Sequence, residues 1–422
     1  MFPTKIARGA GSGGSVPVEC CQICGHEPLE TVLSLGYMPP VNQMVPIGAV
    51  QTQQIWFPTN LMYCSECELV QLGVAVDPVI IFPPEYPYTS GMTRILRENF
   101  ADLYAESSKM LGLTKDDLAI DIGSNDGTLI SNFQNGGHRI LGIEPTDVAR
   151  IANDRGIPTL QAYFSKDVAQ QVKEKHGAAK VITAANCFAH IEDVHAIVEG
   201  IVEMLAPDGV FISESHYLIG LLDDLQYDTV YHEHLRHYTI GSLAYLLGMH
   251  GLEIFHAVKI PTHGGSIRVY AARKGTHAMQ PSVKALRDSE PVGETMRARL
   301  KTFRHDVMLS KERLHAMIRD VKESGGRICG ISAPSRASTL VNYVGLDSNT
   351  IDYVVEIEGS LKIGKCMPGT LIPVVEESRM FDDQPDCAII FSWHIADELA
   401  AKLRAKGFKG TLITPLPVPR FL

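Results

Sequence analysis

Two pairs of cysteines near the start of the sequence have the spacing of metal ligands. Cys21 and Cys24 form one Cys-x2-Cys pair, and Cys64 and Cys67 form the other. Four thiolates supply the tetrahedral coordination that Zn²⁺ prefers and leave no open position for water or substrate. We therefore expect a structural zinc ion, which stabilises a segment too small to fold on its own core. Reduced cysteines without metal are the alternative, and the adjacent Cys20 is a further candidate ligand.

The segment 231–238, Tyr-His-Glu-His-Leu-Arg-His-Tyr, concentrates groups that transfer protons. A neutral histidine accepts a proton near pH 7, and a neighbouring carboxylate or phenol orients it. His234, flanked by Tyr231 and Glu233, is therefore the expected base. Two alternatives stay open. One is a catalytic metal site, although Arg236 stands where His-Glu-x-x-His would place its second histidine; the other is a solvated polar turn.

Two further motifs follow or open apolar strand patterns. Asn-Cys-Phe-Ala-His at 186–190 comes directly after a strand pattern, and ligands of an open α/β sheet bind outside the carboxyl ends of its strands. His190 is therefore expected near a bound ligand, with a structural histidine as the alternative. At 261–268, Pro-Thr-His-Gly-Gly-Ser-Ile-Arg has a glycine pair that lets the backbone approach a ligand closely. Arg268 is expected to face substrate or solvent.

A glycine-bearing turn at 121–128 follows an apolar strand pattern and precedes helix-forming residues. A second apolar run, 139–143, ends at Glu144. Strand, turn, helix, strand and acid in this order predict a pocket for an adenosine ligand, whose ribose hydroxyls the acid accepts. The turn lacks G-x-G-x-x-G, because positions 125 and 128 are Asn and Thr, so it favours S-adenosylmethionine over NAD. An ordinary strand-to-helix turn is the alternative.

The composition is that of a globular protein. Its 422 residues suggest two or three domains, and 45% are apolar and 20% charged. The net charge of −10 argues against a general nucleic-acid binder. No apolar run approaches the roughly 18 residues of a membrane span. The first 17 residues are expected to form a flexible leader, since they lack the apolar core of a secretory signal. We expect a cytoplasmic location, where reduced cysteines bind metal.

Strand and helix patterns then alternate along most of the chain. Those at 118–275 predict a doubly wound sheet. The stretch 281–324 has charged and apolar residues at helical spacing, which predicts a connecting helix or helical hairpin. The alternation restarts at 327–332 and predicts a second, smaller α/β domain. Its first strand-to-helix turn, which carries Ser335 and Arg336, would seat a diphosphate at a helix N-terminus.

Taken in chain order, these motifs resemble the S-adenosylmethionine-dependent C-methyltransferases that make branched-chain deoxysugars from nucleotide-linked 4-keto sugars. The resemblance covers about residues 18 to 420. It departs at 333–338, where the family often has Ala-Pro-Ala-Lys-Gly-Asn and this chain has Ala-Pro-Ser-Arg-Ala-Ser, so it does not specify the nucleotide. It rests on the cysteine pairs and on Tyr-Pro-Tyr-x-Ser (86–90), Asp-Ile-Gly-Ser-Asn-Asp-Gly-Thr (121–128), Phe-Ala-His-Ile (188–191), Tyr-His-Glu-His (231–234) and Thr-His-Gly-Gly-Ser-x-Arg (262–268).

The resemblance implies an α/β fold class with three parts: a small zinc-binding domain, a central Rossmann-like methyltransferase domain and a second, C-terminal Rossmann-like domain. The expected boundaries are a flexible leader at 1–17, the zinc-binding domain at 18–77, the methyltransferase domain at 78–280, a connecting helical segment at 281–324 and the C-terminal domain at 325–422.

The resemblance also implies roles for individual residues. His234 maps onto the family's base, Tyr231 and Glu233 onto its supporting residues, and His190 onto its active-site histidine. The expected cofactor-binding residues are Tyr86, Tyr88, Ser90, Asp121, Gly123, Asn125, Gly127, Glu144 and Asn186. The expected substrate-binding residues are His263, Arg268, Ser335 and Arg336.

The implied reaction moves a methyl group from S-adenosylmethionine to the carbon next to the ketone of a nucleotide-linked 4-keto-deoxysugar, through an enolate. We expect a monomer or weak dimer with no nucleic-acid or membrane partner. Three rival functions stay open: an O- or N-methyltransferase, an inactive zinc-bearing scaffold, and a reductase using the C-terminal domain. The absence of a dinucleotide loop in that domain disfavours the reductase.

Overall fold

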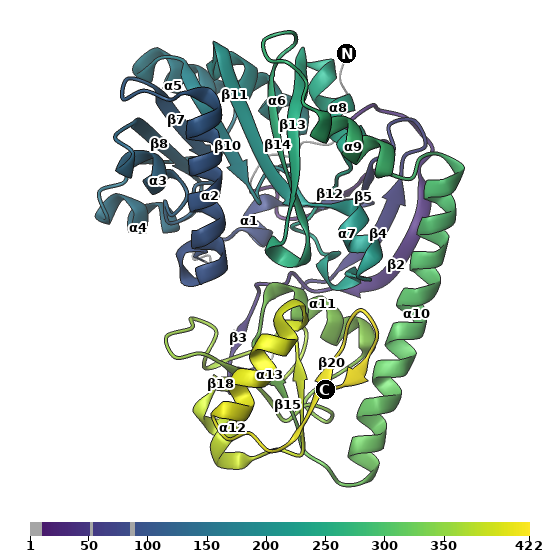
Figure 1. Cartoon of the computed structure of the whole chain (residues 1–422). Helices are drawn as coiled ribbons and strands as arrows, with labels where there is room; N and C mark the ends of the chain where they lie inside the picture. Colours follow the sequence, from purple (N-terminus) through teal and green to yellow (C-terminus); the bar gives the residue numbers. More distant parts are fainter. Residues whose placement is uncertain (1–10, 51–53, 85–88) are drawn as a thin grey trace.

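The computed structural model describes residues 11–50, 54–84 and 89–422. The chain forms an upper part, which contains the N-terminal sheet and a seven-stranded sheet, and a lower part formed by the C-terminal domain (Figure 1). Helix α10 (Glu294–Glu323) runs along one side of both parts. Among the described helices, none is long and apolar enough to cross a membrane.

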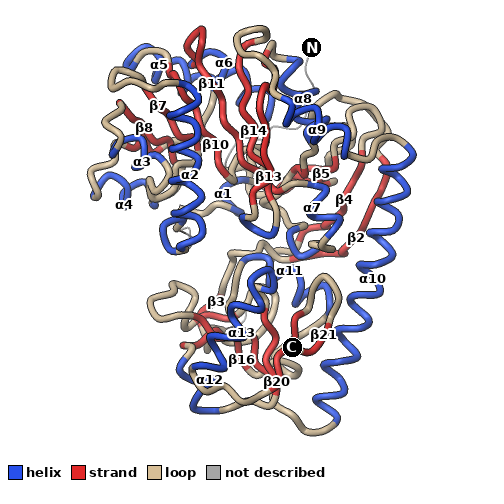
Figure 2. Tube along the Cα trace, viewed as in Figure 1, coloured by secondary structure: helices blue, strands red, loops and turns tan. Residues whose placement is uncertain are grey.

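The central sheet has the strand order β13-β14-β11-β10-β7-β8-β9. Its five strands from β11 to β9 are parallel, whereas β14 runs antiparallel to both β11 and β13. Helices cover both faces (Figure 2), so the strands are apolar on both faces. The strands are β7 (Leu118–Ile122), β8 (Arg139–Glu144), β9 (Thr159–Gln161), β10 (Ala179–Ala185), β11 (Leu205–His216), β13 (Leu252–Ile260) and β14 (Ser266–Arg273).

Alternating side chains of these strands enter two different cores. Ile120 of β7 packs in the larger core, which includes helices α5, α6 and α8. Ala119, the residue before it, packs in a second core with helices α2, α3 and α4. This alternation follows from the two-residue period of a strand. The helices are α2 (Arg94–Leu111), α3 (Ile130–Asn135), α4 (Val148–Asp154), α5 (Lys166–His176), α6 (Val194–Met204) and α8 (Ile240–Met249).

Local capping signals fix several helix ends. The Ser165 hydroxyl accepts a hydrogen bond from the backbone N–H of Val168 at 3.3 Å and starts α5. Thr239 and Ser242 form a reciprocal capping box at the start of α8. Gly112, in the left-handed conformation, ends α2. These residues satisfy backbone groups that a helix end leaves without partners.

The N-terminal sheet has the order β12-β5-β4-β2, and its edge strand comes from far along the chain. Strands β2 (Glu30–Met38), β4 (Phe57–Tyr63) and β5 (Val70–Leu72) belong to the N-terminal domain, but β12 is Arg236–His237. Arg236 pairs with Gln71, and His237 pairs with Val70. The proton-transfer segment 231–238 is therefore attached to the N-terminal sheet. Strand β1 (Ser15–Pro17) pairs separately with β6 (Val74–Val76).

The C-terminal domain has a sheet of order β18-β16-β15-β19-β20-β21, parallel except for β21. Helix α11 (Ser335–Val344) begins at the carboxyl end of β15 and contacts the short helix η2 (Tyr227–Thr229) of the upper part. The carboxyl ends of this sheet therefore face the upper part. The elements are β15 (Ile328–Ile331), β16 (Tyr353–Glu356), β18 (Val374–Glu376), β19 (Cys387–Ile390), β20 (Thr411–Thr414), β21 (Arg420–Phe421), α12 (Ser378–Asp383) and α13 (Ala396–Ala405).

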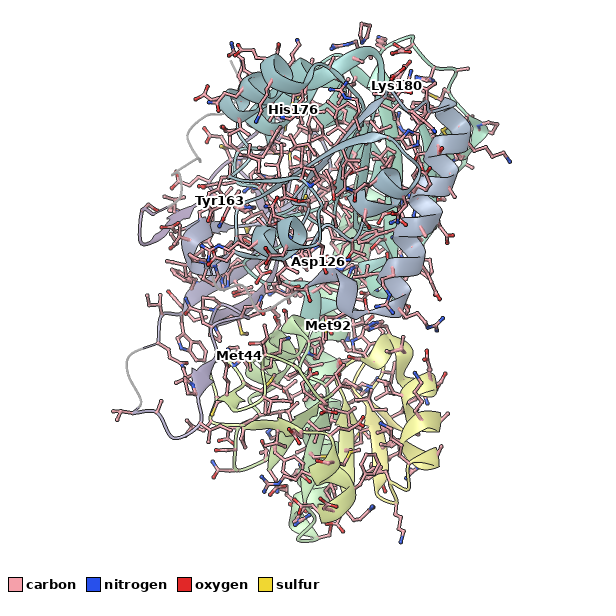
Figure 3. The ribbon with its side chains drawn as sticks, turned by 90° about the vertical axis from the view of Figure 1, so that its left-hand side faces the viewer. Met44, Met92, Asp126, Tyr163, His176 and Lys180 are labelled. Atoms are coloured by element: carbon pink, nitrogen blue, oxygen red, sulfur yellow. The ribbon has the colours of Figure 1, made fainter. Side chains whose placement is uncertain are left out.

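Two connections hold the lower part against the upper one. Helix α9 (Pro281–Ser289) leads into α10, whose buried residues recur every three or four positions from Met296 to Ile318. Strand β3 (Val45–Pro46) of the N-terminal domain pairs with β17 (Lys365–Cys366) of the C-terminal domain. In the side view, Met44 and Met92 lie where the two parts meet, whereas His176 and Lys180 lie at the far end of the upper part (Figure 3).

Candidate active site

The loop after β7 has the tight backbone that its sequence predicts. Gly123, Asn125 and Gly127 have φ angles of 68°, 50° and 78°, in the left-handed region that favours glycine and asparagine. A Cβ atom on Gly123 would lie 2.8 Å from the Cβ of Cys187, so no side chain fits there. The loop thus passes close to the turn that follows β10.

Two carboxyl groups brace this loop. Glu144, the last residue of β8, accepts hydrogen bonds from the N–H of Asn125 at 3.0 Å and from the Thr146 hydroxyl at 2.6 Å. Asp121 accepts one from the Thr183 hydroxyl at 2.7 Å. Burial raises the pKa of Asp121 to about 8, so this carboxyl stays largely protonated at neutral pH. Glu144 ends β8, the second strand of this sheet along the chain, and a carboxylate at this position binds the ribose in related sheets.

The segment before α2 lies against the same loop. The N–H of Ser90 donates to Asn125 Oδ1 at 2.8 Å, and the N–H of Gly91 donates to Asp126 Oδ2 at 3.1 Å. An open groove of about 440 Å³ lies beside this contact, and Asp126 and Met92 are near each other at the lower edge of the upper part (Figure 3). Of the expected donor-side tyrosines, both Tyr86 and Tyr88 lie outside the described residues.

Four histidines from different elements converge close to the loop at 121–128, which is expected to bind the methyl donor and is called the donor loop below. His190 follows β10, His216 ends β11, and His234 precedes β12. The ring centroid of His234 is 5.0 Å from that of His190 and 4.7 Å from that of His216. His263, in the short helix η3 (Thr262–Gly264), lies 5.6 Å from His216. Asn186, directly after β10, has a left-handed φ of 59°. The carboxyl ends of neighbouring strands thus gather residues that are distant in sequence.

His234 is held in one tautomer. Its Nδ1 lies 2.7 Å from the carbonyl oxygen of Thr229, so Nδ1 carries the proton and donates it. A neutral ring in this state has its lone pair on Nε2. Burial lowers the pKa of His234 well below 6.5, and the nearby His216 and His190 lower it further. The Tyr231 ring, with its centroid 4.0 Å away, packs against the imidazole. His234 therefore has the protonation state of a base at neutral pH.

Glu233 binds a group of the N-terminal domain, which in turn binds a group of the C-terminal domain. Asn42 Nδ2 donates to Glu233 Oε1 at 2.6 Å, and the hydroxyl of Ser335, the first residue of α11, donates to Asn42 Oδ1 at 3.0 Å. Lys362 Nζ donates to the carbonyl oxygen of Ala333 at 2.6 Å. Burial lowers the pKa of Lys362, although the nearby Glu356 and Glu233 carboxylates raise it. The Lys362 amino group is therefore held close to the start of α11.

Arg268 faces neither substrate nor solvent, the two surroundings expected from the sequence. Its guanidinium is 4% exposed and pairs with Glu214 Oε1 at 2.6 Å and with Glu106 Oε2 at 2.8 Å. Asn99 of α2 donates to the other Glu214 oxygen at 2.8 Å. The carboxylates of β11 and α2 compensate the buried charge, so Arg268 supports the sheet from within. We do not assign it to the substrate.

Arg336 also differs from its expected role as a diphosphate ligand. Its Nε and Nη2 donate to the two carboxylate oxygens of Asp228 at 2.7 and 2.8 Å. The guanidinium group also lies over the Trp393 ring. Asp228 belongs to η2 of the upper part, so this bidentate pair links the two parts of the molecule. Because two guanidinium donors of Arg336 already bind this carboxylate, its role is to hold the domains together.

The four expected cysteine ligands come together in the N-terminal domain. Ligand atoms of Cys21, Cys24, Cys64 and Cys67 all lie within 4.8 Å of one another, with Sγ–Sγ distances of 3.4 Å between Cys21 and Cys67 and 3.5 Å between Cys24 and Cys64. A tetrahedron with Zn–S bonds of ~2.3 Å has edges of about 3.8 Å. The sulfur atoms fit a zinc ion, which they would hold without an open position.

Three residues of this site were not expected from the sequence: His216, Asn42 and Lys362. His216 ends a strand in the same way as the expected His190 and Glu144, so its place in the pattern was a usable signal. Asn42 and Lys362 lie in irregular segments with no motif, and only the docking of the domains brings them to Glu233.

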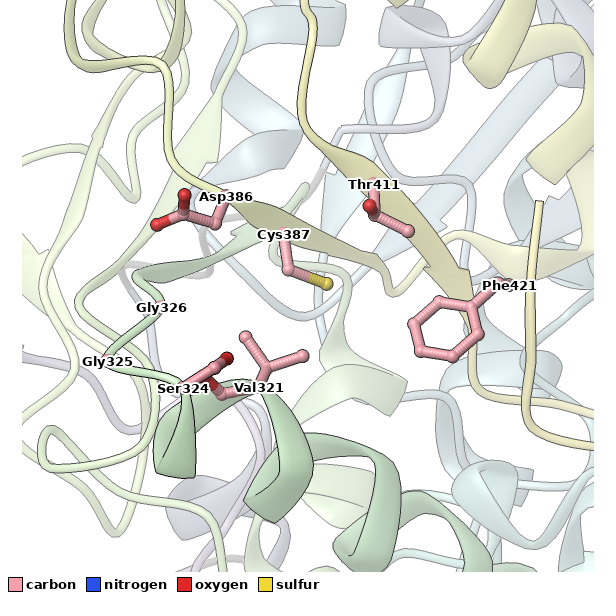
Figure 4. A pocket seen from close by; sticks show the side chains of 8 residues that line it. All are labelled: Val321, Ser324, Gly325, Gly326, Asp386, Cys387, Thr411 and Phe421. Atoms are coloured by element: carbon pink, nitrogen blue, oxygen red, sulfur yellow. The ribbon is translucent and has the colours of Figure 1, made fainter.

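A cavity of about 470 Å³ lies elsewhere, at the base of the C-terminal domain (Figure 4). Gly326, Cys387 and Thr411 line it, and they stand at the amino ends of β15, β19 and β20. Ligands of parallel sheets bind at the carboxyl ends. This cavity therefore lies at the opposite end of the sheet from the start of α11.

Three family models match consecutive parts of the chain. Residues 21–82 match a zinc binding domain, residues 92–257 match a methyltransferase domain, and residues 261–417 match a C-methyltransferase C-terminal domain. Together with the donor loop and the cysteine site, these matches define a zinc-binding, S-adenosylmethionine-dependent methyltransferase with a second α/β domain.

One curated relative matches nearly the whole chain. C-methyltransferase NovU from Streptomyces niveus is 30% identical over 412 residues, which are 96% of this chain and 97% of that one. The chain therefore belongs to the family of S-adenosylmethionine-dependent C-methyltransferases. Among solved structures, a methyltransferase from Clostridium acetobutylicum is 14% identical and magnesium protoporphyrin IX methyltransferase from Synechocystis is 15% identical. They match 44% and 42% of this chain and 94% and 83% of their own, each with a TM-score of 0.33.

Proposed function

We propose that this C-methyltransferase acts on the carbon next to the ketone of a nucleotide-linked 4-keto-deoxysugar. The setting of His234 carries the proposal. Its Nδ1 is fixed on the Thr229 carbonyl at 2.7 Å, and burial keeps the ring neutral. A ketone acidifies the neighbouring C–H bond, and a neutral imidazole with its lone pair on Nε2 can remove that proton. A hydroxyl acceptor would need no carbon-acid base.

In the proposed reaction, His234 removes the α-proton and an enolate forms. Burial lowers the pKa of His190 to about 3, so its neutral ring can donate an N–H to the enolate oxygen. Tyr231 and Glu233 hold the base in place. Bound S-adenosylmethionine supplies an electrophilic methyl group at its sulfonium centre. The donor loop and Glu144 would hold its adenosine, with Asp121, Gly123, Asn125, Gly127, Ser90 and Asn186 around it, and much of the rate would come from this alignment.

The nucleotide would lie between the two parts of the molecule. Helix α11 begins at Ser335 without a side-chain cap, so its first backbone N–H groups can receive an anion. Lys362 adds a positive charge at this place, since its Nζ is bound to the Ala333 carbonyl at the same turn. His263, in the turn between β13 and β14, lies against His216 at the same edge of the sheet. These groups support a diphosphate-binding site at the start of α11, between the C-terminal domain and His234.

The test is a panel of 4-keto-6-deoxyhexoses linked to thymidine, guanosine or cytidine diphosphate, with product mass as the readout. His234→Asn should lower kcat by roughly 10²- to 10⁴-fold. It should also abolish solvent deuterium exchange at the α-carbon, measured with S-adenosylhomocysteine in place of the donor. His315→Gln, on the exposed side of α10, is the matched control.

Two outcomes would contradict the proposal. Exchange that survives in His234→Asn would mean that another group is the base. Product methylated on oxygen, with no α-carbon exchange in the unmodified enzyme, would favour the O-methyltransferase alternative.

A further inference from the structure

One amide side chain connects all three domains at the active site. Asn42 comes from the zinc-binding domain. Its Nδ2 donates to Glu233 Oε1 at 2.6 Å, and its Oδ1 accepts from the hydroxyl of Ser335 at 3.0 Å. Glu233 adjoins the base His234, and Ser335 is the first residue of α11 in the C-terminal domain. The same amide thus touches the catalytic segment and the start of the helix proposed to receive the nucleotide.

The backbone around Asn42 is fixed on both sides. A turn is closed by the N–H of Gln43 donating to the Pro40 carbonyl at 3.1 Å, and β3 follows at once and pairs with β17. The N–H of Ile47 extends this contact by donating to the Gly364 carbonyl at 2.9 Å. The zinc-binding domain therefore reaches the C-terminal domain with a defined register, and Asn42 is not placed by a loose loop.

The partner of Asn42 is fixed as well. The N–H of Leu72 donates to the Leu235 carbonyl at 2.9 Å, and β5 pairs with β12 directly after it. The N-terminal sheet thus anchors the backbone two residues after Glu233. A short hydrogen bond from a neutral amide to a carboxylate is charge-assisted, and it sets the direction of that carboxylate.

We propose that Asn42 is a positioning residue, which orients Glu233 beside the base and links that orientation to Ser335 at the nucleotide end of the site. The zinc-binding domain then completes the active site as well as folding around its metal. Ser335 donates a hydrogen bond to Asn42 on one side and adjoins the proposed diphosphate-binding site on the other. This inference rests on the function proposed above, because it requires Glu233 to support the base.

Four variants test the inference in the full-length, zinc-loaded enzyme: Asn42→Ala, Asn42→Asp, Ser335→Ala and the double variant Asn42→Ala/Ser335→Ala. Gln43→Ala is the matched control, since it changes the next residue of the same turn, whose side chain is exposed. The acceptor is the keto sugar that the unmodified enzyme converts fastest in the panel above. Zinc content and affinity for S-adenosylmethionine are measured for every variant.

Asn42→Ala should lower kcat roughly 10- to 100-fold, because Glu233 loses a charge-assisted hydrogen bond, while zinc content and donor affinity stay unchanged. Ser335→Ala should cost little more in the Asn42→Ala background, because two members of one chain do not act additively. Gln43→Ala should keep the kcat of the unmodified enzyme.

Asn42→Asp gives a readout that a purely structural role would not move. It sets a second carboxylate against Glu233, with Lys362 as the facing cation and His234 and Tyr231 beside it in the chain. Two carboxylates at this distance share a proton as pH falls. The variant should be slower than Asn42→Ala at pH 8 and should recover relative to it toward pH 6, where the unmodified enzyme, whose base stays neutral, keeps its rate.

The outcomes separate this inference from the proposed function. Unchanged kcat and pH profile in both Asn42 variants, with Glu233→Gln impaired, would overturn the role of Asn42 alone. Additive effects of Asn42→Ala and Ser335→Ala would overturn the link to Ser335. A fully active Glu233→Gln would overturn this inference alone, because Glu233 would then not support the base. No product from the unmodified enzyme with any keto sugar would overturn the proposed function and this inference with it.

Discussion

Gly123 leaves the space that the Cys187 side chain occupies, and a methyl group in its place would collide with that side chain at 2.8 Å. The left-handed φ of 68° adds to the demand for glycine. A glycine in a tight strand-to-helix turn is compatible with both the close contact and the left-handed φ. Which residue makes the contact depends on how the turn after β10 packs.

Gly123→Ala should weaken S-adenosylmethionine binding roughly tenfold or more, since strain at such a position costs on the order of 1–3 kcal/mol. Isothermal calorimetry with the donor checks this. Gly156→Ala is the matched control, because Gly156 has a similar φ of 75° and nothing within 4 Å of an added Cβ. Equal losses in the two variants would mean that the positive φ alone, and not the contact with Cys187, is responsible.

Residue types predicted which side chains lie together better than they predicted the partners of single residues. Tyr231, Glu233 and His234 lie together as their spacing suggests, and the tautomer of His234 follows from one backbone carbonyl. Arg268 and Arg336 show that residue type does not predict the partner of a side chain. An arginine beside a ligand and an arginine in a buried ion pair have the same sequence signature, because the distinction depends on carboxylates such as Glu214 and Asp228, far along the chain.

At the scale of elements, the active site depends on one short strand. β12 completes the N-terminal sheet by pairing with β5, so the backbone that carries His234 is shared between the methyltransferase domain and the zinc-binding domain. Two residues are too few to predict a strand from their pattern. The pairing becomes visible only when the two domains are in place.

Removal of zinc should therefore abolish catalysis and not merely loosen a peripheral domain. Without the metal, the N-terminal segment loses the binding free energy that helps it fold, and β5 no longer holds β12. Treatment with a chelator, followed by elemental analysis and methyl-transfer assays, should give loss of activity in proportion to loss of zinc, and zinc should restore it. Full activity in zinc-free enzyme would show that β12 holds its position without the N-terminal sheet.

At the scale of the whole molecule, buried neutral histidines accumulate where the domains meet. His232 and His237 are 1% and 0% exposed, and burial lowers the pKa of each to about 4. His232 lies against Thr59 of the N-terminal sheet, and His237 is part of β12. Protonating either ring would require a charge in the interior, so the docked state favours neutral histidines.

Stability should consequently fall as the pH drops below 6.5. The unfolded chain takes up protons there, whereas the folded chain does not until about pH 4, so each of these histidines costs about 1.4 kcal/mol per pH unit over that interval. The loss is absent above pH 6.5. Urea unfolding from pH 7.5 to 5 checks this, and His237→Gln should flatten the dependence. Exposed His315→Gln should leave it unchanged, and an equal slope in all three proteins would contradict the assignment.

The sequence by itself determined the four zinc ligands, the α/β order of the two larger domains, the donor loop and the candidate base, because each of these is local: it depends on spacing along a few residues or on a repeating strand and helix period. Tertiary structure alone decided that β12 joins the zinc-binding sheet and that Arg268 and Arg336 lie in ion pairs. It also decided that Asn42 links Glu233 to Ser335 and that Lys362 lies near Glu233. These are contacts between segments separated by tens to hundreds of residues. They follow from the burial of apolar surface between domains. This burial is not directional and leaves no pattern in a short stretch of sequence.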